Sequence, residues 1–173
     1  MEWINAFVAK EDDRLGRQGG VCPCMTKILS DNLMYIVVLE DIKSVLEIQL
    51  TQIIMLYSEK FQDIYDIDHN SQDGICLAIL LADKIDDSLI ISVHKKLKPW
   101  FIKRGMMLGE FYPSSNKTSI RTNELNPLRS PIQAFVIRKL SKHDIYFIEK
   151  DTNYSPEETK QMIQLYRQNE SYG

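Results

Sequence analysis

The sequence lacks the motifs of the best-recognised nucleotide enzymes and hydrolases. It contains no P-loop, no GxGxxG fingerprint, and no serine, histidine and aspartate in the order of a hydrolase triad. Nucleoside triphosphatases and nucleotide-dependent oxidoreductases therefore have no support. Cysteine is scarce as well. The three cysteines, two of them separated by a single residue, do not make a disulfide framework.

Long apolar runs and an excess of positive charge are also absent. No apolar run reaches the roughly 18 residues that span a bilayer, and the N-terminus is amphipathic and soon acidic, unlike a secretion signal. We therefore expect a cytoplasmic protein without membrane contact. The formal net charge of −3 argues against a general nucleic-acid binder, although local basic patches remain allowed.

Length and composition fit one globular domain. The 173 residues include 44% apolar and 26% charged residues, which is ordinary for a soluble protein with one core. No internal repeat or low-complexity linker divides the chain. We expect a single domain over residues 1–173.

The hydrophobic pattern predicts helices that alternate with strands. Strands are expected at residues 33–39, 75–81, 106–112 and 132–137, and the first two are apolar enough to be covered on both faces. Helices are expected at residues 2–10, 25–29, 42–65, 88–103 and 156–168, and a turn at Asp68–Gly74. Two β-α-β units and a return strand then predict an α/β (α+β) fold, with a mixed central sheet of four or five strands and helices packed on it.

Several local signals refine these bounds. Asp41 is expected to cap the helix at residues 42–65, and Asp86 or Asp87 is expected to cap the helix at residues 88–103. Pro99 predicts a kink there or a break just before it. Residues 144–148 are expected to be a short extended piece. Ser155, followed by proline and then by Glu158, predicts a capping box at the last helix.

Glu110 and Arg129 are the strongest candidates for chemistry. Each flanks one of two neighbouring predicted strands, so the two side chains are expected to meet at one end of the sheet. Arg129 stands between Pro127 and Pro131, and a stiff backbone suits bidentate capture of a carboxylate. The alternative is that Arg129 and Glu110 pair with each other and only hold the long loop.

The segment Cys22-Pro23-Cys24 is the second candidate. A C-x-C lacks the second ligand pair of a structural zinc site, so zinc is not favoured. Cys22, placed before a proline in a glycine-bearing loop, could serve as an axial haem thiolate or a reactive thiol. The alternative is that Cys22 is buried and Cys24 caps the following turn. Cys76 is expected to be a small core residue.

Two further features have alternative interpretations. Residues 94–104 carry five lysine or arginine charges and no acid, which indicates a solvated helix face with Trp100 and Phe101 turned inward. The alternative there is an anionic ligand near the helix end. Asp144 is expected either to orient His143 or to cap the turn that starts the next segment.

These residues also carry a resemblance to a known family. The motifs are Leu15-Gly16-Arg17, Val21-Cys22-Pro23, Met107-Leu108-Gly109-Glu110-Phe111, Pro127-Leu128-Arg129-Ser130-Pro131, Ile137-Arg138, and Asp144 followed by Phe147. Together they resemble an uncharacterised domain family of bacteria and fungi that is often linked with specialised-metabolite gene clusters. Cys24 departs from that family's pattern, which has an apolar aromatic residue there, and His143 is at a variable position.

A fainter similarity, in chain order and in the cysteine-proline loop, runs to YqcI/YcgG-type proteins, some of which are haem-dependent N-oxygenases. The resemblances imply a small cytoplasmic enzyme or substrate-binding accessory protein of specialised metabolism. Its pocket would be built from residues 16–24, 109–111 and 127–131, and it would bind an anionic metabolite, with haem as one option.

The site residues follow from these motifs. Glu110, Arg129 and Asp144 are the expected catalytic residues; Cys22, Pro23, Gly109 and Ser130 are the expected cofactor-binding residues, with Cys22 as the metal ligand. Expected partners are a small anionic substrate and a second copy or a pathway protein, but not nucleic acid or a membrane. The alternative function is a protein-interaction module without catalytic activity.

Overall fold

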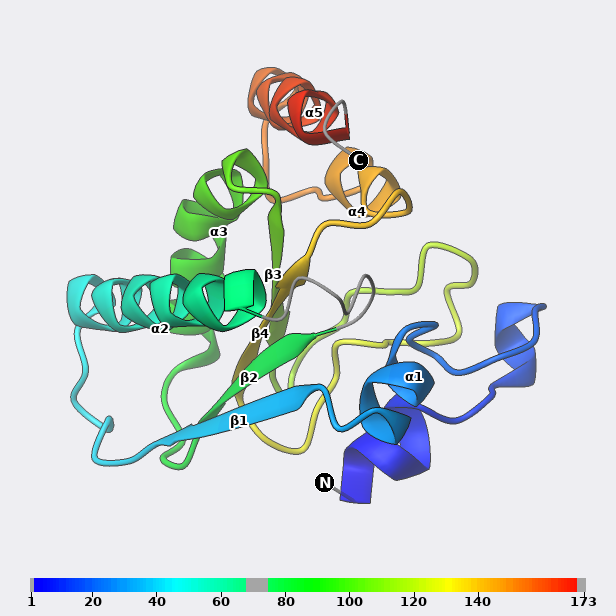
Figure 1. The fold of residues 1–173 in the computed structure, drawn as a ribbon, viewed down its shortest axis with the longest axis horizontal. Helices are drawn as coiled ribbons and strands as arrows, with labels where there is room; N and C mark the ends of the chain where they lie inside the picture. Colours follow the sequence, from blue (N-terminus) through cyan, green and yellow to red (C-terminus); the bar gives the residue numbers. More distant parts are fainter. Residues whose placement is uncertain (1, 68–74, 171–173) are drawn as a thin grey trace.

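The computed structural model describes residues 2–67 and 75–170 and contains a four-stranded mixed sheet (Figure 1). Its strands are β1 (Met34–Leu39), β2 (Cys76–Leu81), β3 (Met106–Phe111) and β4 (Ala134–Lys139), in the order β1-β2-β4-β3. β1 and β2 are parallel, and β4 is antiparallel to both of its neighbours. The return strand β4 therefore lies between the two strands of the second β-α-β unit. The predicted α/β fold is confirmed, whereas the predicted turn at residues 68–74 lies outside the described residues.

The helices follow the predicted order. They are the π-helix η1 (Ile4–Val8), the 3-10 helix η2 (Asp13–Leu15), α1 (Met25–Ser30), α2 (Glu47–Ile67), α3 (Asp87–Lys103), α4 (Ile145–Glu149) and α5 (Pro156–Glu170). Asp86 caps α3 by accepting a hydrogen bond from the Ser88 amide. Ser155 and Glu158 form the predicted capping box, with reciprocal bonds of 2.7 and 3.3 Å.

The predictions for Asp41 and for residues 144–148 are wrong. Asp41 does not cap α2, because it adopts a left-handed backbone with φ of 57° and the helix begins only at Glu47. Residues 145–149 form a helix rather than an extended piece. The Ile148 amide donates to the carbonyl of Asp144, and this bond closes the first helical turn.

Helix α3 continues through Pro99, so the predicted break just before this residue does not occur. A proline cannot donate to the carbonyl four residues earlier, which here belongs to Lys95. The Tyr154 hydroxyl donates to that carbonyl at 2.9 Å and replaces the missing bond. The last segment of the chain thus stabilises an irregular point in α3.

The two faces of the sheet are covered unequally. α2 and α3 pack on one face around Leu77, Ile79 and Phe135 (Figure 1). On the opposite face, η1 and α1 cover only part of the sheet through a smaller cluster that includes Val8, Ile28 and Cys76. α5 packs on α3 and α4 at one end of the molecule. An incompletely covered sheet face is therefore open to form a site.

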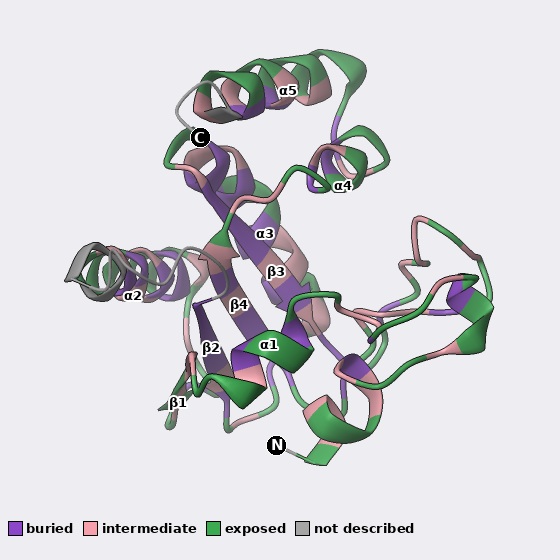
Figure 2. Cartoon of the chain, turned by 45° about the vertical axis from the view of Figure 1, so that its right-hand side comes forward, coloured by how far each residue is buried: buried purple, intermediate pink, exposed green. Residues whose placement is uncertain are grey.

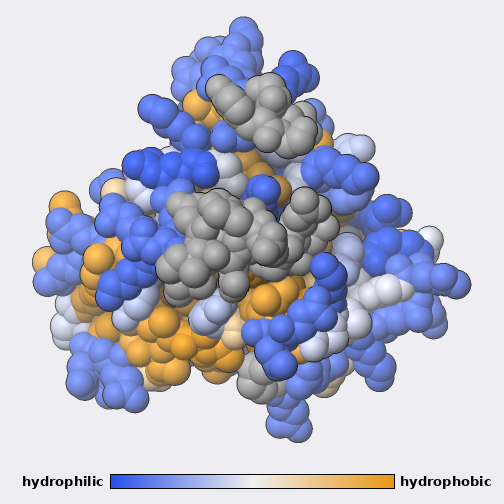
Figure 3. Space-filling model, in the orientation of Figure 1, coloured by the Kyte–Doolittle hydropathy of each residue, from blue (hydrophilic) through white to orange (hydrophobic). Residues whose placement is uncertain are grey.

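The prediction of full burial holds for β2 but is wrong for β1. Every residue of β2 except Leu80 is buried, whereas Tyr35, Ile36 and Val38 of β1 are 38%, 41% and 52% exposed. β1 lies at the sheet edge, where α1 reaches its first residue, Met34, but leaves Tyr35, Ile36 and Val38 uncovered (Figure 2). An apolar area follows β1 and its connection to α2 on the face seen in Figure 3.

Candidate functional site

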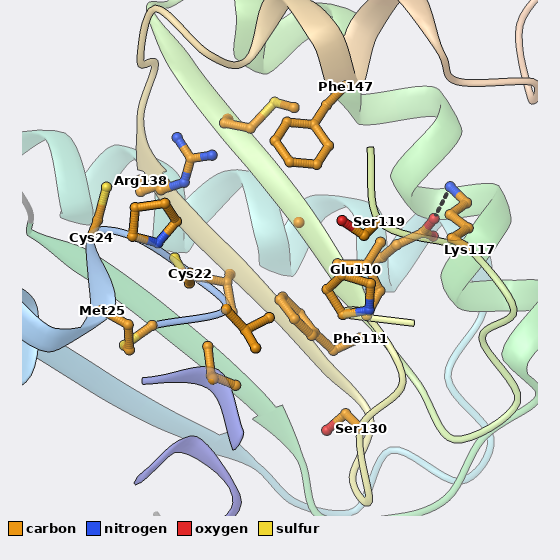
Figure 4. Close-up of a pocket in the computed structure, with 18 of the residues that line it drawn as sticks. Cys22, Cys24, Met25, Glu110, Phe111, Lys117, Ser119, Ser130, Arg138 and Phe147 are labelled. Carbon is orange, nitrogen blue, oxygen red and sulfur yellow. Dashed lines mark hydrogen bonds and ion pairs between the residues drawn. The ribbon is translucent and has the colours of Figure 1, made fainter. Parts of the chain in front are cut away.

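The open sheet face forms the floor of a cleft with a volume of about 1740 Å³. Side chains alternate along each strand, so Ala78, Met107 and Val136 face the open side of the sheet, while Leu108 and Glu110 face α3. Glu110 and His94 border the cleft beside β3, which is an edge strand. The N-terminal segment, the loop of residues 17–24 and the loop of residues 116–123 form its walls. Figure 4 shows side chains of the two loops, among them Cys22 and Ser119, around this space.

Six of the seven predicted site residues line this cleft. They are Cys22, Pro23, Gly109, Glu110, Ser130 and Asp144. Arg129 does not line it. Its side chain is exposed, and its Nε donates to the Ser115 carbonyl at 2.9 Å. The loop segments that the sequence predicted as pocket walls therefore do meet, but Arg129 stands outside.

The cysteine-proline loop is fixed by backbone bonds. The Val21 and Cys22 amides donate to the carbonyls of Lys10 and Val8 at 3.0 and 2.9 Å. Gly20 permits this approach, because a Cβ there would lie 2.6 Å from the Ala9 carbonyl oxygen. Cys22 is half-buried and packs against the cluster under α1.

Gly109 and Phe111 connect the strand end to the N-terminal segment. A Cβ on Gly109 would lie 3.2 Å from the Phe111 ring, so glycine lets that ring lie along the strand. The Phe111 ring also makes an edge contact with Trp3, with ring centroids 6.0 Å apart. To accept a Cβ at Gly109, the Phe111 ring would have to shift by a few tenths of an ångström.

Glu110 does not pair with Arg129, which was the alternative that the sequence left open. Its carboxylate is 1% exposed and accepts a hydrogen bond from Lys117 Nζ at 2.5 Å (Figure 4). Lys117 follows only seven residues later, in the same loop that Arg129 stiffens through Ser115. A local lysine therefore takes the place expected for the arginine.

Glu110 is one end of a row of alternating charges. Lys117 also lies 3.8 Å from Asp151, and Asp151 accepts from Lys98 Nζ at 2.5 Å. The Lys98 ammonium donates further to the carbonyl of Phe147 at 3.3 Å. Two cations and two carboxylates thus balance each other, so burial of the row does not bury a net charge.

Burial controls the ionisation of this row. Desolvation raises the pKa of Glu110, although the Lys117 ammonium opposes that shift. Desolvation also lowers the pKa of Lys98 against the pull of Asp151. Desolvation acts to raise the pKa of Asp151, but the charge and hydrogen bond of Lys98 outweigh it and lower that pKa. The neighbouring charges therefore favour the ionised form of all three groups, but they outweigh burial only at Asp151.

His94 on α3 completes the cluster. Its Nε2 lies 3.0 Å from the Leu108 carbonyl, and its Nδ1 lies 3.6 Å from Oε1 of Glu110. Desolvation, with the charges of Lys98 and Lys117, lowers the pKa of His94 to about 3, so the ring is neutral near pH 7. A carbonyl only accepts, hence Nε2 carries the proton and Nδ1 is a bare acceptor. Within the described residues, His94 Nδ1 and Glu110 Oε2 are buried without a hydrogen-bond partner.

Asp144 is held by Arg138 rather than oriented toward His143. The guanidinium of Arg138 donates to both carboxylate oxygens at 2.6 and 2.7 Å, and the Ser141 amide donates at 2.8 Å. Asp144 is fully buried at the cleft wall, and its partner is 25% exposed. This bidentate pair fixes the end of β4 to the start of α4.

Sequence reasoning missed His94, Lys98, Lys117, Asp151 and Arg138 as site residues. The basic run was expected to be a solvated face, but His94 and Lys98 are 4% and 2% exposed. Their four-residue spacing places both on the helix stripe that contains Ile90 and Phe101. This spacing could have predicted from the sequence that both are buried. The expected inward position holds for Phe101, which is fully buried, and in part for Trp100.

The charged groups around the cleft favour an anion. Six lysine and arginine side chains line it against four carboxylates, although the chain as a whole carries a net charge of −3. In the described part of the chain, no three histidine, cysteine, aspartate or glutamate side chains are grouped as a metal site would require. Nor does any described helix have the length and apolarity needed to cross a membrane.

Comparisons with known proteins give a family but no characterised relative. No curated protein and no solved structure matches the chain. Residues 1–171 match the family described as Domain of unknown function (DUF6875). This match covers nearly the whole chain, and the protein therefore belongs to the DUF6875 family.

Proposed function

We propose that this protein binds a small anionic metabolite in the cleft, as a small cytoplasmic enzyme or a substrate-binding accessory protein of specialised metabolism. The observation that carries the proposal is the composition of the cleft. An apolar floor, a surplus of cations over carboxylates and buried acceptors without partners meet in one cavity. A cavity with an apolar lining and a few convergent polar groups is the usual form of a ligand site.

The polar residues have distinct roles in this proposal. Glu110 acts as the acid or base, because burial raises its pKa and one of its oxygens is unpartnered. Lys117 orients the carboxylate and attracts the anion. Asp144 and Arg138 hold the wall on which the metabolite rests. Arg129 supports the loop through Ser115 and lies outside the cleft.

A thermal-shift titration with anionic probes tests this function. 3-Phenylpropionate and phenyl phosphate combine an apolar body with one anionic group, and binding of either should raise the melting temperature. Lys117→Met should weaken the shift, and added salt should reduce it further. Lys103→Met is the matched control, because Lys103 is exposed on α3 and does not line the cleft. Equal shifts in both variants, or none in the wild type, would refute the proposal.

Haem binding is a second candidate, favoured by the position of Cys22. This residue lines the cleft beside the apolar side chains of Met25 and Phe111, and the cavity volume is large enough for a macrocycle. Cys22 would supply the axial thiolate, and haem would supply oxidative chemistry there. The Cys22 thiolate is thus a suitable haem ligand, and the cleft has the volume to hold haem. A hemin titration followed in the Soret region tests it.

The alternative function, a protein-interaction module, is favoured by β1. This strand is at the sheet edge, and its sequence MYIVVL contains no charge, proline or glycine that would discourage pairing. Light scattering over a range of protein concentrations tests for a homodimer. Val38→Lys should abolish any such dimer, because Val38 is half exposed on the strand.

A further inference from the structure

His94 and Glu110 each carry a buried acceptor that favours a ligand with hydrogen-bond donors. Both side chains line the cavity, and both are more than nine-tenths buried. Nδ1 of His94 and Oε2 of Glu110 have no hydrogen-bond partner among the described residues. Leaving a buried acceptor unpaired is costly, so a group that donates to it is bound with corresponding preference.

Neither acceptor can satisfy the other. The Leu108 carbonyl fixes the proton of the neutral imidazole on Nε2, which leaves only a lone pair on Nδ1. The carboxylate of Glu110 is likewise acceptor-only while ionised, and Lys117 already donates to its Oε1. Nδ1 lies 3.6 Å from Oε1, and the unpartnered Oε2 belongs to the same carboxylate. An intervening donor atom could lie at ordinary hydrogen-bond distance from both side chains.

Since there are two unpaired acceptors, a ligand group that satisfies both must donate two hydrogens. A hydroxyl carries one hydrogen and can donate to one acceptor only, whereas a primary amine or ammonium carries at least two. An ammonium also gains from the carboxylate charge.

We infer that the ligand carries a primary amine as well as its anionic group, and that this amine donates to both His94 and Glu110. The inference rests on the proposed function and narrows it to amine-bearing anions, such as amino-acid-like metabolites. The anionic group interacts with the cationic side chains of the cleft, while the amine occupies the position between α3 and β3. His94 and Glu110 are then the residues that distinguish such a ligand from a simple carboxylate.

Three matched probes separate the inference from the proposed function. 3-Phenylpropionate carries the anion alone, phenethylamine the amine alone, and phenylalanine both. Calorimetric titration should show that phenylalanine binds about tenfold or more tightly than either of the others. Glu110→Gln should reduce that preference, because the glutamine amide can donate to His94 Nδ1 in place of the ligand. If 3-phenylpropionate binds as tightly as phenylalanine, the amine inference fails and the anion-binding function stands. If no probe binds, both fail.

A ligand-free measurement tests the same inference. The nitrogen-15 spectrum of the histidine rings should contain a signal from a neutral ring with a protonated Nε2 and a bare Nδ1 that His94→Gln removes. Phenylalanine should shift this Nδ1 signal, whereas 3-phenylpropionate should not. A protonated Nδ1 in the free protein, or an Nδ1 signal that no amine shifts because water occupies the position, would overturn the inference.

Discussion

Nδ1 of His94 faces Oε1 of Glu110 across 3.6 Å, and the two side chains are 5% and 1% exposed. The residues come from different elements, α3 and β3, and lie in a cluster whose other charges are Lys98, Lys117 and Asp151. Since the imidazole is neutral, the contact is between two acceptors rather than an ion pair. The stability and the binding properties of the protein should both depend on it.

The first prediction concerns pH. The pKa of His94 is about 3 in the folded protein and near 6.5 when exposed, so the unfolded chain binds the extra proton between these values. Stability should therefore fall on acidification from pH 6.5, by up to about 1.4 kcal/mol per pH unit for this residue. Denaturant unfolding at several pH values measures that slope, and His94→Gln should reduce it.

The contribution of Glu110 to the pH dependence of stability has the opposite sign to that of His94. Variants must therefore be compared to separate the two. Because burial raises the pKa of Glu110, its contribution is fully present below its ordinary value of 4.5 and is lost as pH rises through the raised value. Subtracting the His94→Gln curve from the wild-type curve isolates the histidine. Identical slopes in the two proteins would contradict the assigned neutral imidazole.

The second prediction contrasts two arginines. Arg138→Met should remove the bidentate partner of the fully buried Asp144, at a cost of roughly 3–5 kcal/mol and a fall in melting temperature of about 10 °C or more. Arg129→Met should cost far less, because Arg129 is exposed and donates one side-chain bond to Ser115. Melting curves of the two variants measure this difference in stability. A larger loss for Arg129→Met would show that the wrong arginine was identified as the structural anchor.

The third prediction concerns the cysteine-proline loop. Gly20→Ala would place a Cβ 2.6 Å from the Ala9 carbonyl oxygen, so the backbone must move, at a cost of about 1–3 kcal/mol. Gly16→Ala meets no atom within 4 Å, and its cost is limited to about 1–2 kcal/mol for the left-handed backbone. Only Gly20→Ala should also weaken probe binding in the cleft. Unchanged binding in that variant would separate the loop from the site.

The fourth prediction concerns haem. If Cys22 is an axial thiolate, hemin added under reducing conditions should give a Soret band that Cys22→Ser abolishes and Cys24→Ser retains. Cys24 is the control because it is exposed at the start of α1, two residues from Cys22. A wild-type protein that does not bind hemin would remove this branch while leaving the anion site intact.

The fold was predictable from the sequence because its signals are local. The apolar run of β2, the Asp86 cap and the capping box at Ser155 each act within a few residues, and all three hold in the structure. The burial of β1 was not predictable in this way. Its sequence is as apolar as that of β2, and only the strand order places it at the edge.

The site was predictable in outline but not in its electrostatics. The glycine, proline and cysteine motifs identified the loops that form the cleft, because such residues mark unusual backbone positions. Glu110 could pair with Lys117 or with Arg129, and the conformation of the long loop decides which of them it contacts. Lys117 and Asp151 lie 34 residues apart in the numbering, yet both contact the same row of charges, and no local pattern predicts that meeting.

The central claim is that the cleft over the open sheet face binds an anionic metabolite, and blocking that face tests it most directly. Val136 lies on the cleft floor, so Val136→Trp should place a large ring over the apolar floor and obstruct it, whereas Val38→Trp alters an exposed valine of β1 that does not line the cleft. Circular dichroism first verifies that both variants fold.

Calorimetric titration with 3-phenylpropionate is then made on the wild type and both variants. The account predicts saturable binding to the wild type and to Val38→Trp, and its loss in Val136→Trp. Binding that persists in a folded Val136→Trp variant, or binding absent from the wild type, would contradict it.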